Sequence, residues 1–206
     1  MNNTKKIFPI LLVILFMLTL SKQNFSEEFK IFKKTSFSVM TGYFIPSESS
    51  YKKIYGNRNF PISVSFSLEI SKITGLSLGY RFIKSSGETI ILGPKLFEEH
   101  YSLTLTNHTF FVNLFIFYTG SRFKPKFEIG LNLSDYSEKW KEINISTENQ
   151  KFGYNTAFSV ESSLSRKISC IVKLQYLSIS TPSQSKIKEK INLGGIETLL
   201  GICYYF

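Results

Sequence analysis

The chain has 206 residues, a formal net charge of +10 and two cysteines. This length accommodates one domain, and a basic surface suits encounters with anionic partners, lipid headgroups included. The two cysteines, Cys170 and Cys203, provide neither a disulfide framework nor the ligand spacing of a zinc site. The composition therefore excludes a disulfide-stapled scaffold and gives no indication of a metal centre.

The amino terminus has the layout of a secretory signal peptide. Two lysines precede an apolar run from Ile7 to Leu20, and the polar sequence SKQNFSEE follows. The run is short for a membrane-spanning helix, although no clear small-residue cleavage site follows it. We therefore expect a signal peptide over residues 1–22, a lead-in over 23–33 and a β-barrel over 34–206. An uncleaved membrane anchor is the alternative.

The rest of the chain alternates between apolar and polar residues, which is the period of a β-strand with two different environments on its faces. The clearest stretch is PISVSFSLEIS, residues 61–71, in which five apolar side chains alternate with polar ones. The sequence thus predicts an all-β chain. The eight expected strands are centred on residues 37–43, 62–70, 76–82, 101–116, 127–133, 154–160, 168–176 and 196–206.

The expected connections alternate in length, which is typical of an up-and-down antiparallel barrel with long loops at one rim and tight turns at the other. The fourth strand changes phase, because Leu103 and Leu105 lie on one parity and Phe110 and Val112 on the other. We expect a β-bulge at residues 106–109 to absorb this change. The long connections are predicted at residues 45–59, 85–99, 138–152 and 181–191, and the short ones at 71–74, 119–124 and 165–167.

The two faces of the strands predict which side meets lipid. The non-apolar positions hold small residues, such as Ser63, Ser65 and Gly130, which fit the narrow interior of an eight-stranded barrel. The same face carries charges of both signs, which should pair because a lone buried charge is costly. We expect a filled polar lumen, and the alternative is a path for protons or small ions. The predicted lumen network is Glu69, Arg81, Glu128, Glu161, Lys173 and Glu197.

Aromatic residues gather where this arrangement places the two rims, as expected for side chains that favour the headgroup level of a bilayer. Tyr43, Trp140 and Tyr154 are predicted at the long-loop rim, and Tyr118 and Phe123 at the short-turn rim. Periodicity alone does not distinguish inside from outside. A soluble, lipocalin-like ligand carrier with inverted faces is therefore the rival interpretation.

The last predicted strand ends in LLGICYYF, with apolar residues at alternate positions. Together with the export signal and the eight alternating strands, this pattern resembles bacterial outer-membrane β-barrel proteins over residues 34–206. In those proteins such a terminal pattern is the signal that the insertion machinery reads, which here implies Leu200, Ile202, Tyr204 and Phe206. The stretch TGYFIPSESSYKKIYG, residues 41–56, is similar to the first strand and loop of small OmpW-like or OmpX-like barrels.

The resemblance implies a monomeric, transmembrane, eight-stranded β-barrel in a bacterial outer membrane. The implied partners are outer-membrane lipid, lipopolysaccharide and the barrel-insertion machinery, with no cofactor and no nucleic acid. The expected role is structural, adhesive or another surface interaction, and the alternative is a narrow channel for small or hydrophobic compounds. The candidates for contact with polyanions are the loop lysines Lys52, Lys53, Lys139, Lys141, Lys186, Lys188 and Lys190.

The sequence offers little for catalysis. Its two histidines, His100 and His108, lie in the fourth predicted strand, and Glu99 and Ser102 are near the first of them. Some small outer-membrane barrels modify lipids with a His, a Ser and a carboxylate, but neither histidine falls in a motif of those enzymes. We expect no catalytic residue, and a lipid-A-modifying enzyme is the least favoured alternative.

Overall fold

The computed structural model describes residues 34–56, 59–92, 98–118, 123–179 and 192–206. The predicted signal peptide and lead-in lie outside the described residues. In chain order the elements are β1 (Lys34–Pro46), α2 (Ser49–Tyr55), β2 (Ile62–Glu69), β3 (Thr74–Leu92), β4 (Glu98–Phe117), β5 (Phe123–Trp140), β6 (Ile145–Ser163), β7 (Ile168–Ile179) and β8 (Gly195–Tyr205).

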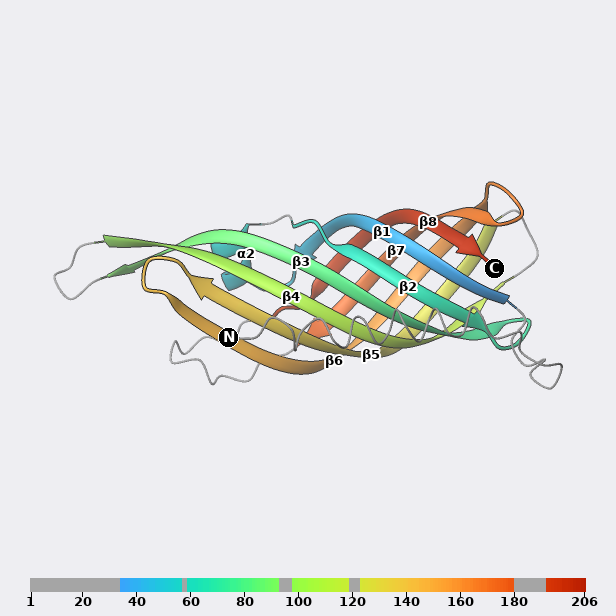
Figure 1. Cartoon of the computed structure of the whole chain (residues 1–206), viewed down its shortest axis with the longest axis horizontal. Coiled ribbons are helices and arrows are strands. Elements are labelled where there is room, and N and C mark those ends of the chain that lie inside the picture. Colours follow the sequence, from blue (N-terminus) through green and yellow to red (C-terminus); the bar gives the residue numbers. More distant parts are fainter. Residues whose placement is uncertain (1–33, 57–58, 93–97, 119–122, 180–191) are drawn as a thin grey trace. The chain divides into compact units, whose positions relative to one another are not determined.

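The eight strands form one closed antiparallel barrel (Figure 1). Each strand pairs with the next along the chain, and β8 pairs with β1 to close the sheet. Following the paired residues once around the barrel from Phe44 leads back to β1 at Lys34, ten residues earlier, so the strands are staggered and tilted. Closure satisfies the backbone groups that a sheet edge would expose to lipid. The predicted eight-stranded antiparallel barrel is confirmed.

Burial separates the two faces of the wall in the direction predicted for a membrane barrel. In β7, alternate residues from Ser169 to Ile179 are buried, whereas Val172 and Leu174 are exposed. The exposed side chains of the other strands include many large apolar residues, and the buried ones include serine, asparagine and charged residues. A soluble ligand carrier requires the reverse arrangement, so the lipocalin-like interpretation is wrong.

Four consecutive strands are longer than the others. β3, β4, β5 and β6 contain 18 to 20 residues each, whereas a tilted strand needs only about 9–11 residues to cross a bilayer. Beyond the last residue paired with β2, Phe82, they continue together on one side of the barrel (Figure 1). We call this part the projecting sheet; it comprises residues 83–92, 98–107, 136–140 and 145–149.

The projecting sheet corrects the predicted loop lengths. The connections predicted at residues 85–99 and 138–152 are mostly strand, because pairing of β3 with β4 and of β5 with β6 continues past the expected boundaries. The turn between β5 and β6 is confined to residues 141–144. Polar and charged sequence in these stretches therefore marks strands that lie beyond the apolar band of the wall, and not flexible loops.

The fourth strand contains no bulge. β4 pairs with β3 over its whole length in one continuous register, so the bulge predicted at residues 106–109 is wrong. The change of apolar parity has another cause: Leu103 and Leu105 are buried inside the barrel mouth, whereas Val112 and Leu114 are exposed on the outer face of the wall. The same strand thus presents its apolar side chains outward in the wall and inward at the mouth.

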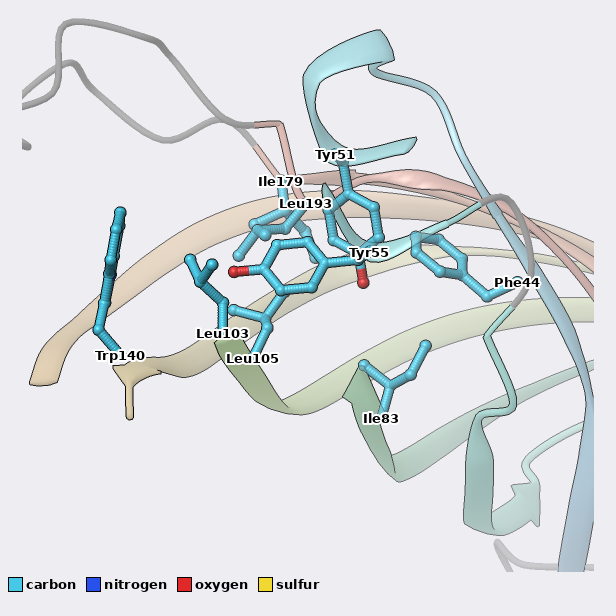
Figure 2. Packing of buried hydrophobic residues seen from close by; sticks show 9 residues of the cluster. All are labelled: Phe44, Tyr51, Tyr55, Ile83, Leu103, Leu105, Trp140, Ile179 and Leu193. Carbon is cyan, nitrogen blue, oxygen red and sulfur yellow. The ribbon is translucent and has the colours of Figure 1, made fainter. Parts of the chain in front are cut away.

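The helix α2, which the sequence did not predict, supplies the partner for those inward side chains. Tyr51 and Tyr55 lie about one helical turn apart, on one face, and both are buried. Trp140, predicted at the outer aromatic rim, is buried in the same group at 8% exposure, because β5 points it inward. The mouth cluster consists of Phe44, Tyr51, Tyr55, Ile83, Leu103, Leu105, Trp140, Ile179 and Leu193 (Figure 2).

Specific backbone contacts hold α2 in place. Gly56 ends the helix with φ +81°, a value that favours glycine, and donates its N–H to the carbonyl of Lys52 at 3.0 Å. A Cβ on Gly87 would lie 1.9 Å from the carbonyl oxygen of Ile54, so the end of α2 packs directly on the backbone of β3.

Across the described ranges, no helix has the length and hydropathy to span a membrane.

Candidate functional site

The lumen contains a buried ion pair close to the mouth cluster. Arg81 of β3 donates from Nε to Oε1 of Glu197 of β8, and both residues have 0% exposure. The Arg81 guanidinium also lies over the ring of Phe44, 4.8 Å from its centroid. Two opposite charges removed from water in this way depend on each other, since either one alone would be uncompensated.

A second charged group lies on β5 and β7. Glu128 accepts hydrogen bonds on Oε2 from Lys173 Nζ and Asn113 Nδ2, both at 2.9 Å, and its Oε1 lies 3.3 Å from Lys126 Nζ. Asn155 Nδ2 extends the network by donating to Asn113 Oδ1 at 2.9 Å. This carboxylate therefore has two cationic neighbours and an amide donor, which compensate for its burial.

The remaining two acidic residues of the predicted network lie toward the short turns. Glu69 pairs with Lys124, whose Nζ also lies 4.2 Å from the ring centroid of Phe117. Glu161 accepts a hydrogen bond from the hydroxyl of Tyr205. The lumen is thus occupied by side-chain pairs along its length, from Arg81 near the mouth to Lys124 near the turns.

All six residues of the predicted lumen network are buried, and the structure brings them together in pairs that the sequence did not specify. Arg81 meets Glu197 and Lys173 meets Glu128, whereas Glu69 and Glu161 bind partners from outside the predicted set. The partners that were missed are Lys124, Lys126, Asn113, Asn155 and Tyr205. Lys124 and Lys126 share the parity of Glu128, so extending the fifth predicted strand by three residues would have included them.

Charges in the described lumen balance. The residues concerned are Glu69, Glu128, Glu161 and Glu197 on the acidic side, and Arg81, Lys124, Lys126 and Lys173 on the basic side. A lumen with equal numbers of positive and negative side chains requires no bound counter-ion. Among the described residues, no group of three His, Cys, Asp or Glu side chains is placed to hold a metal ion.

The mouth cluster covers this lumen with phenol rings. Tyr51 shares a hydrogen bond with Ser85 Oγ at 3.0 Å, and burial raises the pKa of its hydroxyl. Burial raises the pKa of Tyr55 as well, with a further increase from the nearby Glu138 carboxylate. Glu138 also accepts a hydrogen bond from Trp140 Nε1 at 2.8 Å. Both tyrosines are therefore held in their neutral form.

A Tyr55→Phe variant tests this placement. An acid whose pKa is raised on folding stabilises the fold below its unfolded pKa, and that contribution is lost as the pH rises through the folded pKa. In the folded protein, the difference between the wild-type and Tyr55→Phe tyrosinate absorbance curves should therefore appear only above about pH 10, the ordinary value for tyrosine. In the denatured proteins the difference should lie near that value. A folded-state difference near the ordinary value would show that Tyr55 is solvated.

The other predicted residues lie on outer surfaces. Leu200, Ile202, Tyr204 and Phe206 are exposed on the outer face of β8 and the residue after it. Lys53, Lys139 and Lys141 are exposed at the mouth end, and Lys52 is partly exposed on α2. Lys186, Lys188 and Lys190 lie outside the described residues.

Both histidines, His100 and His108, lie on β4. His100 is exposed on β4, and the backbone N–H of Ser102 donates to Glu142 at 2.9 Å. His108 shares a hydrogen bond between Nδ1 and the Tyr80 hydroxyl at 2.6 Å, and its ring lies beside those of Tyr80 and Phe82. The geometry around His108 is that of an aromatic cluster on the outer face of the wall.

The two cysteines are free: Cys203 is buried and Cys170 is partly exposed. They face opposite sides of the wall, since Cys170 pairs with Ile202 and Cys203 with Ser169 across β7 and β8. Their side chains therefore do not point toward one another, as a disulfide between them would require.

Comparison with solved structures shows the same fold. The outer-membrane protein OprG from Pseudomonas aeruginosa matches with a TM-score of 0.62 at 14% identity, over 85% of this chain and 97% of that one. Neisserial surface protein A matches with a TM-score of 0.59 at 14% identity, over 84% and 97%. Ail of Yersinia pestis, in complex with the heparin analogue sucrose octasulfate, matches with a TM-score of 0.50 at 9% identity, over 84% and 97%. No protein-family profile and no curated protein matches the sequence. The chain has the fold of the small eight-stranded outer-membrane β-barrels.

Proposed function

We propose that the protein is an integral bacterial outer-membrane barrel with a closed lumen, and that its projecting sheet makes structural or adhesive contacts at the cell surface. The observation that carries the proposal is the division of the wall into an apolar outer face and a charge-balanced, paired interior. An apolar outer face needs lipid around it, and an interior whose charged side chains are paired needs no counter-ion.

The orientation follows from the two ends of the barrel. In outer-membrane barrels the turns on the periplasmic side are short and the extracellular segments are long. Here the turns at residues 70–73 and 164–167 are short, and the projecting sheet extends from the opposite end. Its outer face exposes Lys84, Ser86 and Glu148, which suit water and not hydrocarbon. The projecting sheet is therefore the surface-exposed part of our proposal.

An epitope inserted at residues 141–144, the turn at the tip of β5 and β6, tests this orientation. Antibody should bind intact cells that carry this insertion, because the turn lies at the surface end. The matched control places the same epitope at residues 164–167, where labelling should require permeabilised cells. Labelling of intact cells by the second insertion and not by the first would overturn the proposed orientation.

A narrow channel is the second candidate, and the mouth cluster bears on it directly. Tyr51 and Tyr55 occupy the mouth, and side-chain pairs occupy the wall section below it. We expect the wild-type protein in planar bilayers to show no ion conductance above the empty bilayer. Stable conductance steps that disappear when the lumen is blocked would favour the channel instead.

We propose outer-membrane lipid as the partner of the wall. During assembly, the insertion machinery would read the alternate apolar residues Leu200, Ile202, Tyr204 and Phe206, which the described fold leaves exposed on the outer face. Lipopolysaccharide phosphates are a weaker candidate for a binding partner of the mouth end. Its exposed lysines alternate with carboxylates such as Glu88, Glu142 and Glu148, so attraction to a polyanion would be modest and sensitive to salt.

A further inference from the structure

Two turns at the short-turn end of the barrel are built in the same way. In the turn from β2 to β3, the N–H of Ser71 donates to the carbonyl of Thr74 at 3.0 Å, and in the turn from β6 to β7 the N–H of Ser165 donates to the carbonyl of Ile168 at 2.9 Å. Each serine hydroxyl also accepts from the opposite N–H, at 3.0 Å from Thr74 and at 3.1 Å from Ile168. Both turns are therefore closed by backbone and by side chain, which fixes the residues between.

This end of the barrel differs in charge from the mouth end. Four cationic side chains are exposed here, namely Lys34, Lys72, Arg166 and Lys167. The acidic residues described at this end, Glu69 and Glu161, are both buried in the lumen. At the mouth end, by contrast, exposed lysines alternate with exposed carboxylates such as Glu88 and Glu148. Among the described residues, the short-turn end thus presents positive side chains and no exposed acidic one.

The cations of the two turns lie next to exposed apolar side chains. Ile73 follows Lys72 in the first turn, Leu164 begins the second, and both apolar residues are largely exposed. The outer face of the wall stays apolar up to this end, where Tyr118 and Phe123 are exposed. Aromatic side chains favour the headgroup level of a bilayer, and lysine and arginine can lay their stems on apolar surface while the charge stays in water. The turn cations therefore lie at the boundary between hydrocarbon and headgroups.

The two turns lie on opposite sides of the barrel. In the closed sheet they are separated by four strands in either direction, β3 to β6 one way and β7 to β2 the other, and both are at the end where β8 ends (Figure 1). A compact anion would reach only one of them. A flat anionic surface that surrounds the barrel contacts both, so the arrangement suits a membrane leaflet.

We infer that the turns at residues 70–73 and 164–167 bind the headgroups of anionic phospholipids, with Lys72, Arg166 and Lys167 contacting the phosphates. A zwitterionic phospholipid neutralises its phosphate with its own ammonium group, so the turns favour lipids with a net negative charge. Attraction of this kind contributes a factor of roughly five for each lysine or arginine near the surface. The inference rests on the proposed membrane role and deepens it by naming the lipid class held at the periplasmic end.

Electron paramagnetic resonance of spin-labelled lipids tests the inference in phosphatidylcholine vesicles that contain the wild-type protein. The fraction of labelled lipid whose motion the protein restricts measures the affinity for that lipid. We expect a several-fold preference for labelled phosphatidylglycerol over labelled phosphatidylcholine. The preference should disappear at about 1 M salt, where charges are screened within about 3 Å. Equal restricted fractions for the two labels at low salt would overturn the inference.

The triple variant Lys72→Gln, Arg166→Gln, Lys167→Gln assigns the preference to the two turns. It removes the three charges and leaves both closing serines in place, so the barrel should fold and keep its heat-dependent gel mobility. We expect the preference for phosphatidylglycerol to fall several-fold. A folded variant that keeps the wild-type preference would overturn the assignment to these turns.

The matched control is Lys53→Gln, Lys84→Gln, Lys139→Gln, which removes three exposed cations from the mouth end. We expect it to keep the wild-type preference, because these lysines lie among carboxylates. An equal loss in the control variant would show that net charge alone sets the preference, contrary to the inference.

Two further outcomes separate this inference from the proposed membrane role. Wild-type protein that shows no lipid preference but sediments with purified peptidoglycan would show that the turns bind an acidic polymer, and the inference would be wrong. A restricted fraction of zero for both labels would contradict the membrane role itself, since no lipid would surround the wall. Equal, non-zero fractions contradict the lipid selectivity alone.

Discussion

Replacing Arg81 with methionine is expected to destabilise the barrel by about 3–5 kcal/mol, the usual cost of removing one partner of a buried ion pair. Glu197 is 0% exposed and has Arg81 as its ion-pair partner, so the variant would leave its carboxylate uncompensated. Equilibrium urea unfolding of the protein in phospholipid vesicles, followed by the shift in gel mobility between folded and unfolded barrels, measures the change.

Two further variants separate the ion pair from the volume of the side chain. The double variant Arg81→Met, Glu197→Met removes both charges and should recover most of the stability, because apolar side chains of similar size can replace a buried pair. The variant Lys84→Met, at an exposed position of the same strand, should change stability by less than about 0.5 kcal/mol. A single Arg81→Met variant as stable as the wild type would show that the pair is not enclosed.

Replacing Ile129 with arginine is expected to destabilise the protein in a bilayer by about 2–4 kcal/mol, the cost of a cationic side chain on the lipid face near the membrane midplane. Ile129 is 55% exposed on the outer face of β5, between the exposed residues Phe127 and Leu131. In a water-soluble barrel the same substitution would remove an exposed apolar side chain at little cost. The effect therefore reports whether lipid surrounds the wall.

The matched control is Ser137→Arg, on the same strand and the same parity but within the projecting sheet. Eight residues at about 3.4 Å each place it about 27 Å further along the strand, beyond the apolar band. We expect little change in stability there. Equal effects at positions 129 and 137 in vesicle unfolding experiments would contradict the proposed membrane boundary.

Much of the wall could be predicted from the sequence, because the alternation of side chains is a local property of an extended chain. The strand from Ile62 to Glu69 follows from parity alone, and so does the division that puts Ile202 and Tyr204 on one face and Glu128 and Lys173 on the other. The direction in which the apolar face points needed one more observation, namely that small residues suit a narrow interior.

The same reasoning failed in β4, where the apolar side chains occupy outward positions in the wall and inward positions at the mouth. Leu103 and Leu105 look like a slipped register in β4, and only the docking of α2 inside the mouth explains why apolar side chains turn inward there. Trp140 was misplaced for the same reason. Seven residues rich in serine and lysine give a weak helix signal by themselves, and most of the stability of such a short helix comes from packing.

By itself, the sequence determined strands with one apolar and one polar face, because this alternation depends only on neighbouring residues along each strand. The small residues on the polar face added the prediction that this face lines a narrow barrel. Only the tertiary structure decided which charges meet. Arg81 and Glu197 are 116 residues apart, and Lys124 and Glu69 are 55 apart on strands that do not pair with each other. Their contacts cross the lumen, so they depend on how far each strand is staggered when the sheet closes. That stagger is a property of the whole barrel and of no single segment.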